Sequence, residues 1–304
     1  MKKMEFSDFT EAVVEKIRGY LPESFADASV ELSTVTKNND LRLTGLTIRS
    51  VDKSISPTIY LEHFYERYMD GEDMSEVLES IANTRVRSDV NEFDVGQITD
   101  FDRVESRIVP KLINKAWNEQ FLAERPHTDI ADLSVVYHIS LKNDMLGNAS
   151  VAVTNQLAQQ WGVDTDTLHE LAVQNMFNLY PSTFEPMSKV LASMMGDDAA
   201  ELITASCPEE EMIWVISNKE RTNGGATVLD EELMKNIVEK FGEEGFYLIP
   251  SSIHEWLLVR ASENTDASDI EQMIHEVNAE QVAQDERLGS HPYRFCVEEG
   301  LLPV

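Results

Sequence analysis

The stretch that decides the fold is MIWVISNKERTNGGATVLDEELMKNIVEKFGEEGFYLIPSSIHEWLLVR, residues 212–260. It opens with an apolar run of strand length, residues 212–217, as expected for a strand that is covered on both faces. Residues 246–249 and 256–259 are two further apolar runs, separated by the loop PSSIHE. This pattern predicts a central strand, a connecting segment and a β-hairpin in which Pro250 ends the first strand.

The segment between these strands predicts an amphipathic helix over residues 229–241. Apolar side chains recur at every fourth position, which places them on one helical face: Leu229, Leu233, Ile237 and Phe241. Thr227 followed by Asp230 resembles a capping box, and Gly242 supplies a left-handed stop. We therefore expect strand, helix and hairpin to share one core that contains Trp214, Ile216, Leu233, Ile237, Leu248 and Leu257.

Upstream, residues 1–104 predict a smaller region of helices around a hairpin. The expected elements are a helix at 6–20, strands at 29–36 and 41–48, and helices at 57–69 and 74–82. Asn and Asp at positions 37–40 tolerate left-handed backbone and suit the hairpin turn. Residues 83–104 have little periodicity, which places the domain boundary near 104. An aromatic group at helical spacing is either core or a ligand platform: Tyr60, Phe64, Tyr65 and Tyr68.

Residues 105–304 alternate between strand-like and helix-like segments, which predicts an α+β domain with a mixed sheet covered by helices. Strands are expected at 108–113, 133–141 and 149–153, and helices at 155–161, from Asp164 or Thr165 onward, at 185–195 and at 266–285. The tail, residues 288–304, carries Pro292, Gly300 and Pro303 and is expected to be irregular.

The formal net charge is −30 over 304 residues, and it is unevenly spread. Residues 1–196 hold 31 acidic and 18 basic residues, net −13, and residues 197–304 hold 24 acidic and 7 basic, net −17. Such a field repels nucleic acid phosphates and anionic membranes, so direct binding to either is not expected. The charge fits a solvated surface, a basic protein partner, or mimicry of DNA by carboxylates.

The sequence predicts a cytoplasmic protein with reduced thiols. Residues 1–11 lead into polar sequence rather than an apolar signal segment, and no run approaches the roughly 18 apolar residues that span a bilayer. Two cysteines, Cys207 and Cys296, are too few for a disulfide framework.

A set of short motifs resembles a known family. They are NAS at 148–150, TNQL at 154–157, WGV at 161–163, LHELA at 168–172, YLIPSS at 247–252 and HE at 254–255, followed by Leu257. Together they resemble the acidic bacterial proteins of domain-of-unknown-function family 5688 over most of the chain. The C-terminal two thirds is also similar to a second uncharacterised bacterial family. Neither resemblance implies an activity, a cofactor or a site residue.

The search for catalytic and metal motifs is mostly negative. The sequence contains no G-x-x-x-x-G-K-[ST], G-x-G-x-x-G or G-x-S-x-G pattern. His-Glu occurs at 169–170, 254–255 and 275–276, but in none does a second His follow four residues later to complete a zinc pair. The cysteines are not part of a C-x-x-C pair. We expect no cofactor and no metal.

The remaining chemical candidate is the hairpin loop with Ser251, Ser252, His254 and Glu255. A Ser hydroxyl needs a base to become a nucleophile, and a His oriented by a carboxylate can serve as one. Known triads draw their members from different elements, so a polar turn between two strands is the alternative.

Three weaker candidates each have a structural alternative. His138 in an apolar strand is either a ligand or a satisfied core histidine. Asn218 with residues 223–225 is either an anion-binding nest or a plain loop. Cys207 precedes three glutamates, which raise a thiol pKa and disfavour a reactive thiol.

These observations favour a non-enzymatic, cytosolic bacterial protein that binds or regulates another protein, with a basic partner suggested by the charge. The alternatives are an unfamiliar enzyme, for example a hydrolase that uses the 251–255 loop, and an acidic DNA mimic. A deep pocket with convergent polar groups would favour the enzyme, and carboxylates at phosphate spacing would favour the mimic.

Overall fold

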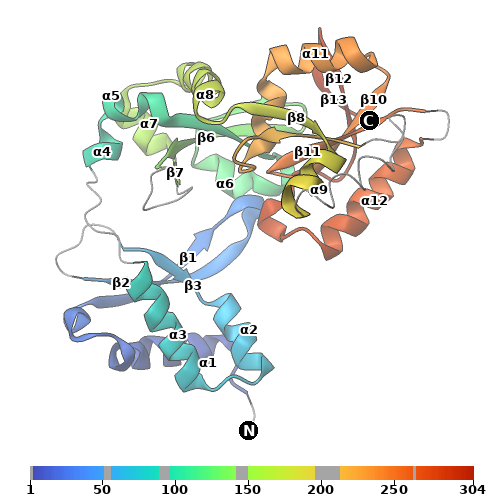
Figure 1. The fold of residues 1–304 in the computed structure, drawn as a ribbon. Coiled ribbons are helices and arrows are strands. Elements are labelled where there is room, and N and C mark those ends of the chain that lie inside the picture. The colour runs from blue at the N-terminus through green and yellow to red at the C-terminus, as the bar shows by residue number, and fades with distance from the viewer. Residues whose placement is uncertain (1–2, 51–55, 89–95, 142–149, 196–212, 263–264) are drawn as a thin grey trace. The chain divides into compact units, whose positions relative to one another are not determined.

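A computed structural model describes residues 3–50, 56–88, 96–141, 150–195, 213–262 and 265–304 (Figure 1). Contacts between Cα atoms group the chain into two compact units. The smaller comprises Met1–Lys37 and Leu41–Ile98, and the larger comprises Asn38–Asp40 and Thr99–Val304. The sequence predicts a domain boundary near residue 104, and the change of unit in the structure lies at Thr99.

The smaller unit combines helices with an antiparallel sheet of order β1-β2-β3. Its strands are β1 (Ser29–Thr36), β2 (Arg42–Arg49) and β3 (Thr58–Tyr60), and its helices are α1 (Phe6–Lys16), α2 (Glu62–Asp70) and α3 (Met74–Arg87). Apolar side chains from both layers form one core that includes Phe9, Val13, Leu46, Ile48, Val77 and Ile81.

The expected hairpin is confirmed, with its turn residues Asn38–Asp40 assigned to the larger unit, and the helix expected at 6–20 is an α-helix to Lys16 followed by a 3₁₀ helix at Ile17–Tyr20. Asn39 and Asp40 in the turn have φ of 59° and 47°, the left-handed backbone that these residue types tolerate. Tyr65 and Tyr68 pack against the Phe9 ring, at 5.2 and 5.5 Å between centroids, so the aromatic group contributes to the core.

The helix expected from residue 57 is wrong at its start. Residues 58–60 pair with β2 instead, and the N–H of Leu61 donates to the Thr44 carbonyl at 3.0 Å. A strand this short has no periodicity of its own, so the sequence does not separate it from the helix that follows. The next helix, α3, begins with a capping box between Asp73 and Glu76 and runs beyond residue 82.

The larger unit opens with short helices and a sheet built on β6. Its elements are α5 (Phe101–Val104), β4 (Ile108–Asn114), α6 (Glu119–Ala123), β5 (His127–Ile130), β6 (Leu133–Ser140), β7 (Ser150–Ala152), α7 (Asn155–Trp161) and α8 (Thr165–Leu179), and α4 (Gly96–Thr99) contains the change of unit. β6 pairs with β4 along one edge and with β5 and β7 along the other, all antiparallel. α8 packs on this sheet through contacts with β4, β5 and β6.

The helix signals read from this region are confirmed. Thr154 caps α7 by accepting from the N–H of Leu157, and Gly162 ends α7 in the left-handed conformation. Asp164 caps α8 by accepting from the N–H of Thr167 at 2.9 Å.

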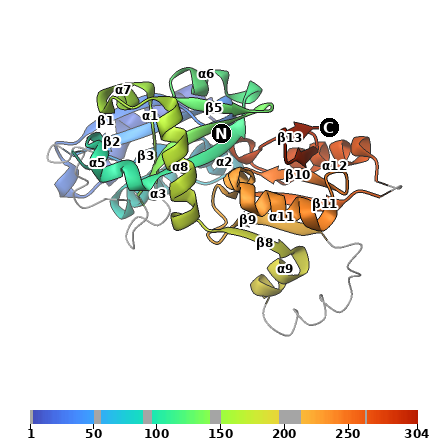
Figure 2. The same ribbon diagram turned by 90° about the horizontal axis from the view of Figure 1, so that it is seen from above.

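A second, six-stranded sheet has the order β13-β12-β10-β11-β9-β8, also with antiparallel pairs throughout (Figure 2). Its strands are β8 (Ser182–Pro186), β9 (Trp214–Asn218), β10 (Phe246–Ser252), β11 (Glu255–Arg260), β12 (Tyr293–Cys296) and β13 (Gly300–Pro303). Three helices lie between these strands in the sequence: α9 (Met187–Met195), α11 (Glu231–Phe241) and α12 (Ala267–Glu280). The α+β class is confirmed, whereas the sheets of the described residues are antiparallel rather than mixed.

The expectation that Leu257 shares one core with the other named residues is wrong. Register places Trp214 and Leu248 opposite Leu258, so these three share one face, and the Phe241 ring of α11 lies 6.0 Å from that of Trp214. Leu257 points to the other face, because side chains alternate along a strand. There it packs with a cluster that includes Ile270 and Ile274 of α12.

Three further expectations need correction. α11 is capped by Asp230, which accepts from the N–H of Leu233 at 3.0 Å, while the Thr227 hydroxyl donates to the Gly224 carbonyl. The tail expected to be irregular forms the β12–β13 hairpin, because four residues suffice for each strand once β10 supplies a partner. Gly242 ends α11 with a positive φ of 79°, as glycine allows, but its ψ of 153° lies outside the left-handed helical region that the sequence predicts.

Candidate functional site

The β10–β11 connection is much shorter than the expected six-residue loop. Pro250 pairs with Trp256 and Ser252 pairs with Glu255, with a register shift between Pro250 and Ser252. Only Ile253 and His254 lie between the two strands. Pro250 therefore does not end its strand.

Both ring nitrogens of His254 face groups of the protein itself. Nδ1 accepts a hydrogen bond from the N–H of Asn223 at 3.0 Å, and Nε2 lies 3.4 Å from Oε1 of Glu286. A neutral imidazole that is protonated on Nε2 satisfies both partners at once. This arrangement leaves neither nitrogen directed at a nucleophile.

The two serines of the turn bond elsewhere. The Ser252 hydroxyl accepts from the backbone N–H of His254 at 3.1 Å, a local turn contact, and the Ser251 hydroxyl donates to Oε1 of Glu255 at 3.4 Å. The structure thus brings Ser251 to Glu255 but neither serine to the His254 ring. These contacts therefore do not form the catalytic arrangement of Ser, His and carboxylate that the sequence analysis considers.

The glycine-rich loop before α11 interlocks with this turn. The N–H of Gly225 donates to the Ile253 carbonyl at 2.9 Å, and the indole N–H of Trp256 donates to the Gly225 carbonyl at 2.8 Å. A Cβ at Gly224 would lie 2.3 Å from Oγ of Ser217, so a side chain does not fit there. Because the N–H groups of Asn223 and Gly225 are used within the chain, the anion-nest hypothesis for this loop is not supported.

His138 is a neutral core histidine with one nitrogen unsatisfied. Burial lowers the pKa of its imidazole to about 3, and the charges of Lys111 and Arg125 act in the same direction. Nδ1 lies 3.4 Å from the Ser150 hydroxyl, while the buried Nε2 has no hydrogen-bond partner among the described residues. The adjoining hollow of about 20 Å³ has room for one water molecule.

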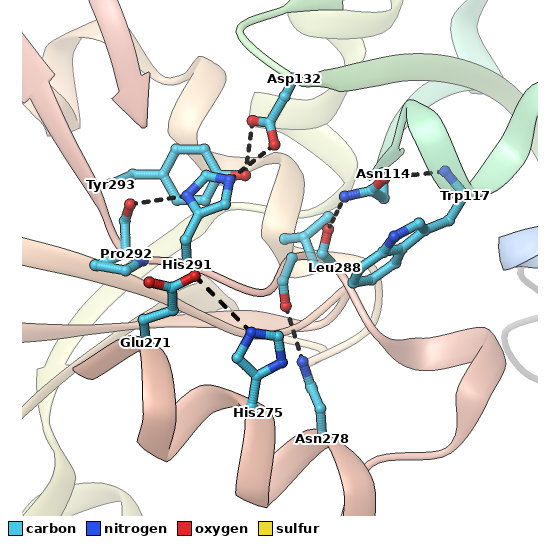
Figure 3. Close-up of polar contacts among 11 residues, drawn as sticks. Asn114, Trp117, Asp132, Glu271, His275, Asn278, Leu288, His291, Pro292 and Tyr293 are labelled. Carbon is cyan, nitrogen blue, oxygen red and sulfur yellow. Dashed lines mark hydrogen bonds and ion pairs between the residues drawn. The ribbon is translucent and has the colours of Figure 1, made fainter. Parts of the chain in front are cut away.

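A third histidine forms an ionic cluster between the two sheets of the larger unit (Figure 3). Oδ2 of Asp132 lies 2.9 Å from Nε2 of His291, and Oδ1 accepts from the Tyr293 hydroxyl at 2.8 Å. Nδ1 of His291 lies 3.1 Å from the Pro292 carbonyl. Because both ring nitrogens face acceptors, the ring makes both bonds only when it is protonated.

The pKa shifts of this cluster agree with the geometry. The bond to Asp132 raises the pKa of His291 and outweighs the effect of burial. Burial raises the pKa of Asp132, but the hydrogen bonds from His291 and Tyr293 reverse this and leave it lowered. Burial and the Asp132 charge raise the pKa of the Tyr293 hydroxyl. The cluster is an ion pair that joins the β5–β6 turn to β12, and it has no free base.

An open groove is lined by α8, α11 and the β12–β13 hairpin, which are labelled in Figure 1. We call it the α8–α11 groove. It consists of two adjoining hollows of about 690 and 720 Å³ that share Val173, Phe177 and Leu229. Its apolar lining includes Val173, Phe177, Leu229, Phe295, Val297 and Leu301. Phe177 and Val297 both line the first hollow, and their side chains are 43% and 44% exposed.

The rim of the α8–α11 groove is acidic. It carries the carboxylates of Glu170, Glu231, Glu232, Glu239, Glu298 and Glu299. Lys235 is the one lysine or arginine among the described lining residues, and it pairs with Glu231 at 3.0 Å. Nδ1 of His169 lies 3.3 Å from the Tyr137 hydroxyl, and burial lowers the pKa of this imidazole, so His169 is neutral at pH 7.

The comparisons with known proteins give one result. Residues 6–296 match the model of a family of unknown function, DUF5688. The chain belongs to this family. No curated protein and no solved structure matches it. The resemblance to DUF5688 is confirmed, and membership of this family assigns no activity to any of the sites above.

The structure of this DUF5688 protein also bears on metal binding and on membrane spans. Among the described residues, no group of three or more His, Cys, Asp or Glu side chains is placed to hold a metal ion. No helix in the part of the chain that the structure describes has the length and apolar character of a membrane span. Cys296 is a free thiol, and Cys207 lies outside the described residues.

Little in the sequence predicts the groove. Its walls come from α8, from α11 and from the tail, and the tail was expected to be irregular. One signal was available: Val173 and Phe177 lie four apart on α8, off the face that carries Leu168, Ala172 and Met176. A second apolar stripe on one helix indicates a second packing surface.

Proposed function

We propose that this protein binds another protein and that it does so through the α8–α11 groove rather than by catalysis. The observation that supports the proposal most strongly is the exposure of Phe177 and Val297 in a groove lined by apolar side chains. Apolar side chains that line an open groove and remain exposed are a common feature of protein-binding sites. We also propose a bacterial cytosolic setting, which the family resemblance and the thiol content favour.

The turn that carries Ser251, Ser252, His254 and Glu255 supports the non-enzymatic hypothesis. His254 bonds with Asn223 and lies near Glu286, so its ring is occupied by structural partners. A general base needs a nitrogen within hydrogen-bond reach of the proton it removes. The contacts of His254 therefore give no support to the hypothesis that this turn is an enzyme active site.

Site-specific photo-crosslinking in the native cell tests the proposal. A photoreactive phenylalanine analogue at position 177 should cross-link a protein of defined mass. The same analogue at position 273 is the matched control, since Met273 on α12 is 44% exposed and lines neither hollow. Equal products at both positions, or none at 177, would contradict the proposed function.

A further inference from the structure

We infer that the α8–α11 groove receives an amphipathic helical segment of the partner, with an apolar face flanked by Lys or Arg. This inference rests on the proposed function and specifies the chemistry of the partner. Three observations support the inference: the spacing of the apolar residues in the groove, the charge of the rim, and the poor fit of other occupants.

The apolar surface suits a helix. Val173 and Phe177 are one helical turn apart on α8, with the buried Phe295 and Leu301 behind them on β12 and β13. An amphipathic helix presents anchors at the same spacing, at positions i, i+4 and i+7, to a groove of this kind. Val173, Phe177 and Leu229 line both hollows, and the residues that only the second hollow adds are polar or charged, so the apolar surface belongs to the first hollow.

An added β-strand fits less well. β13 is an edge strand of the six-stranded sheet and lies beside the groove, yet it spans only Gly300–Pro303. Pro303 has no N–H to donate to an incoming strand. An edge this short supplies few of the main-chain hydrogen bonds on which strand addition depends.

The rim selects the charge of the partner. Glu170 on α8, Glu231 and Glu232 on α11, and Glu298 and Glu299 after β12 surround the apolar surface. The lysine among them is already paired with Glu231. Carboxylates on several sides of an apolar groove complement a segment whose apolar stripe is bordered by basic side chains.

The chain itself is a poor occupant. A second copy brings another net charge of −30, and like charges repel. Residues 196–212, GDDAAELITASCPEEEM, carry six acidic residues and no Lys or Arg, so this segment does not complement the rim either. The occupant therefore comes from a different, more basic chain.

A peptide titration tests the inference. The probe is a synthetic peptide of roughly 14 residues, about four helical turns, with Leu on one face and Lys on the flanks. Its controls are a scrambled peptide of the same composition and an analogue with Glu in place of Lys. Fluorescence anisotropy of the full-length protein should show that both controls bind at least about tenfold more weakly than the probe.

Protein variants locate the binding. Phe177→Ser should weaken probe binding by roughly tenfold, and Met273→Ser should leave it unchanged. The double substitution E298K/E299K should weaken it by a comparable factor, and E276K/E280K on α12, with the same change in net charge, should not. Circular dichroism and unfolding midpoints confirm that the variants are folded.

The outcomes separate this inference from the proposed function. Equal binding of the scrambled or the acidic peptide, or equal effects of the two charge reversals, would overturn the inference. The cross-link at position 177 would still support protein binding in that case. A cross-linked partner that is a DNA-binding protein held by its nucleic acid surface, and released by E276K/E280K as readily as by E298K/E299K, would overturn the inference in favour of DNA mimicry.

Discussion

The β10–β11 turn and the α8–α11 groove belong to the same unit and use their side chains in opposite ways. In the turn, His254, Ser252 and the neighbouring Gly225 direct their polar groups at the protein itself. In the groove, Phe177 and Val297 remain largely exposed. Residue types alone therefore do not locate the exposed surface: the turn's polar side chains form hydrogen bonds within the chain, whereas ordinary apolar residues line the open groove.

The largest expected effect concerns the two faces of α11, the helix that forms one wall of the groove. Ile237 is 1% exposed, so Ile237→Ala should lower the free energy of unfolding by about 2–5 kcal/mol through the cavity it leaves. Asn236→Ala, on the exposed face, should stay within about 0.5 kcal/mol. Equal denaturation midpoints for the two variants would remove the distinction between a structural and a binding face.

The next effect tests whether the glycine loop is part of the structural turn. Gly224→Ala places a Cβ 2.3 Å from Oγ of Ser217 and 2.4 Å from the His254 carbonyl, so the backbone must move. We expect a loss of about 1–3 kcal/mol in unfolding free energy. Gly19→Ala, where no atom lies within 4 Å, serves as the control and should change little. A stable Gly224→Ala variant would show that the loop and the turn are not interlocked.

His254→Ala should destabilise more than an ordinary surface substitution. It leaves the partly buried N–H of Asn223 without its acceptor, and an unsatisfied donor of this kind costs about 1–2 kcal/mol. Ser252→Ala removes only a local turn contact and should cost about 0.5 kcal/mol. Chemical denaturation of both variants measures the difference. Loss of a hydrolytic activity on His254→Ala, with stability unchanged, would instead restore the catalytic hypothesis.

The smallest effect concerns pH and the pair of Asp132 and His291. The folded pKa of His291 is raised, so the stability it contributes is fully present below its unfolded pKa of about 6.5 and is lost as pH rises through the folded value. The partner carboxylate is 42% exposed, which limits the contribution to roughly 0.5–1 kcal/mol. Unfolding measured from pH 6 to 9 should show this loss, and Asp132→Asn should reduce it. An unchanged pH dependence in Asp132→Asn would show that the pair does not stabilise the fold.

Much of the fold was readable from local signals. The bounds of α7, residues 155–161, match the expectation because Thr154 and Gly162 mark both ends with side-chain and backbone chemistry. The missed strands β3 and β8 and the β12–β13 hairpin are short and depend on partners far away in the sequence. Their residues have no periodicity that a local pattern can detect.

The candidate site was harder to predict from the sequence than the fold. Proline and two serines suggested a long loop at residues 250–255, whereas pairing with β11 holds Pro250 and Ser252 in a strand. The groove arises from three segments that meet only in the folded chain. Sequence could indicate that Val173 and Phe177 form a second stripe, but not that they stay uncovered.

One titration tests the central claim most directly, because it compares the two regions in one assay. The basic amphipathic peptide is titrated into the wild type, Phe177→Ser and His254→Ala, and the unfolding free energy of each is measured in the same buffer. We predict that Phe177→Ser lowers peptide affinity by roughly tenfold with stability within about 0.5 kcal/mol of the wild type, and that His254→Ala lowers stability with affinity unchanged. If His254→Ala lowered the peptide affinity and Phe177→Ser left it unchanged, the groove would not be the binding surface.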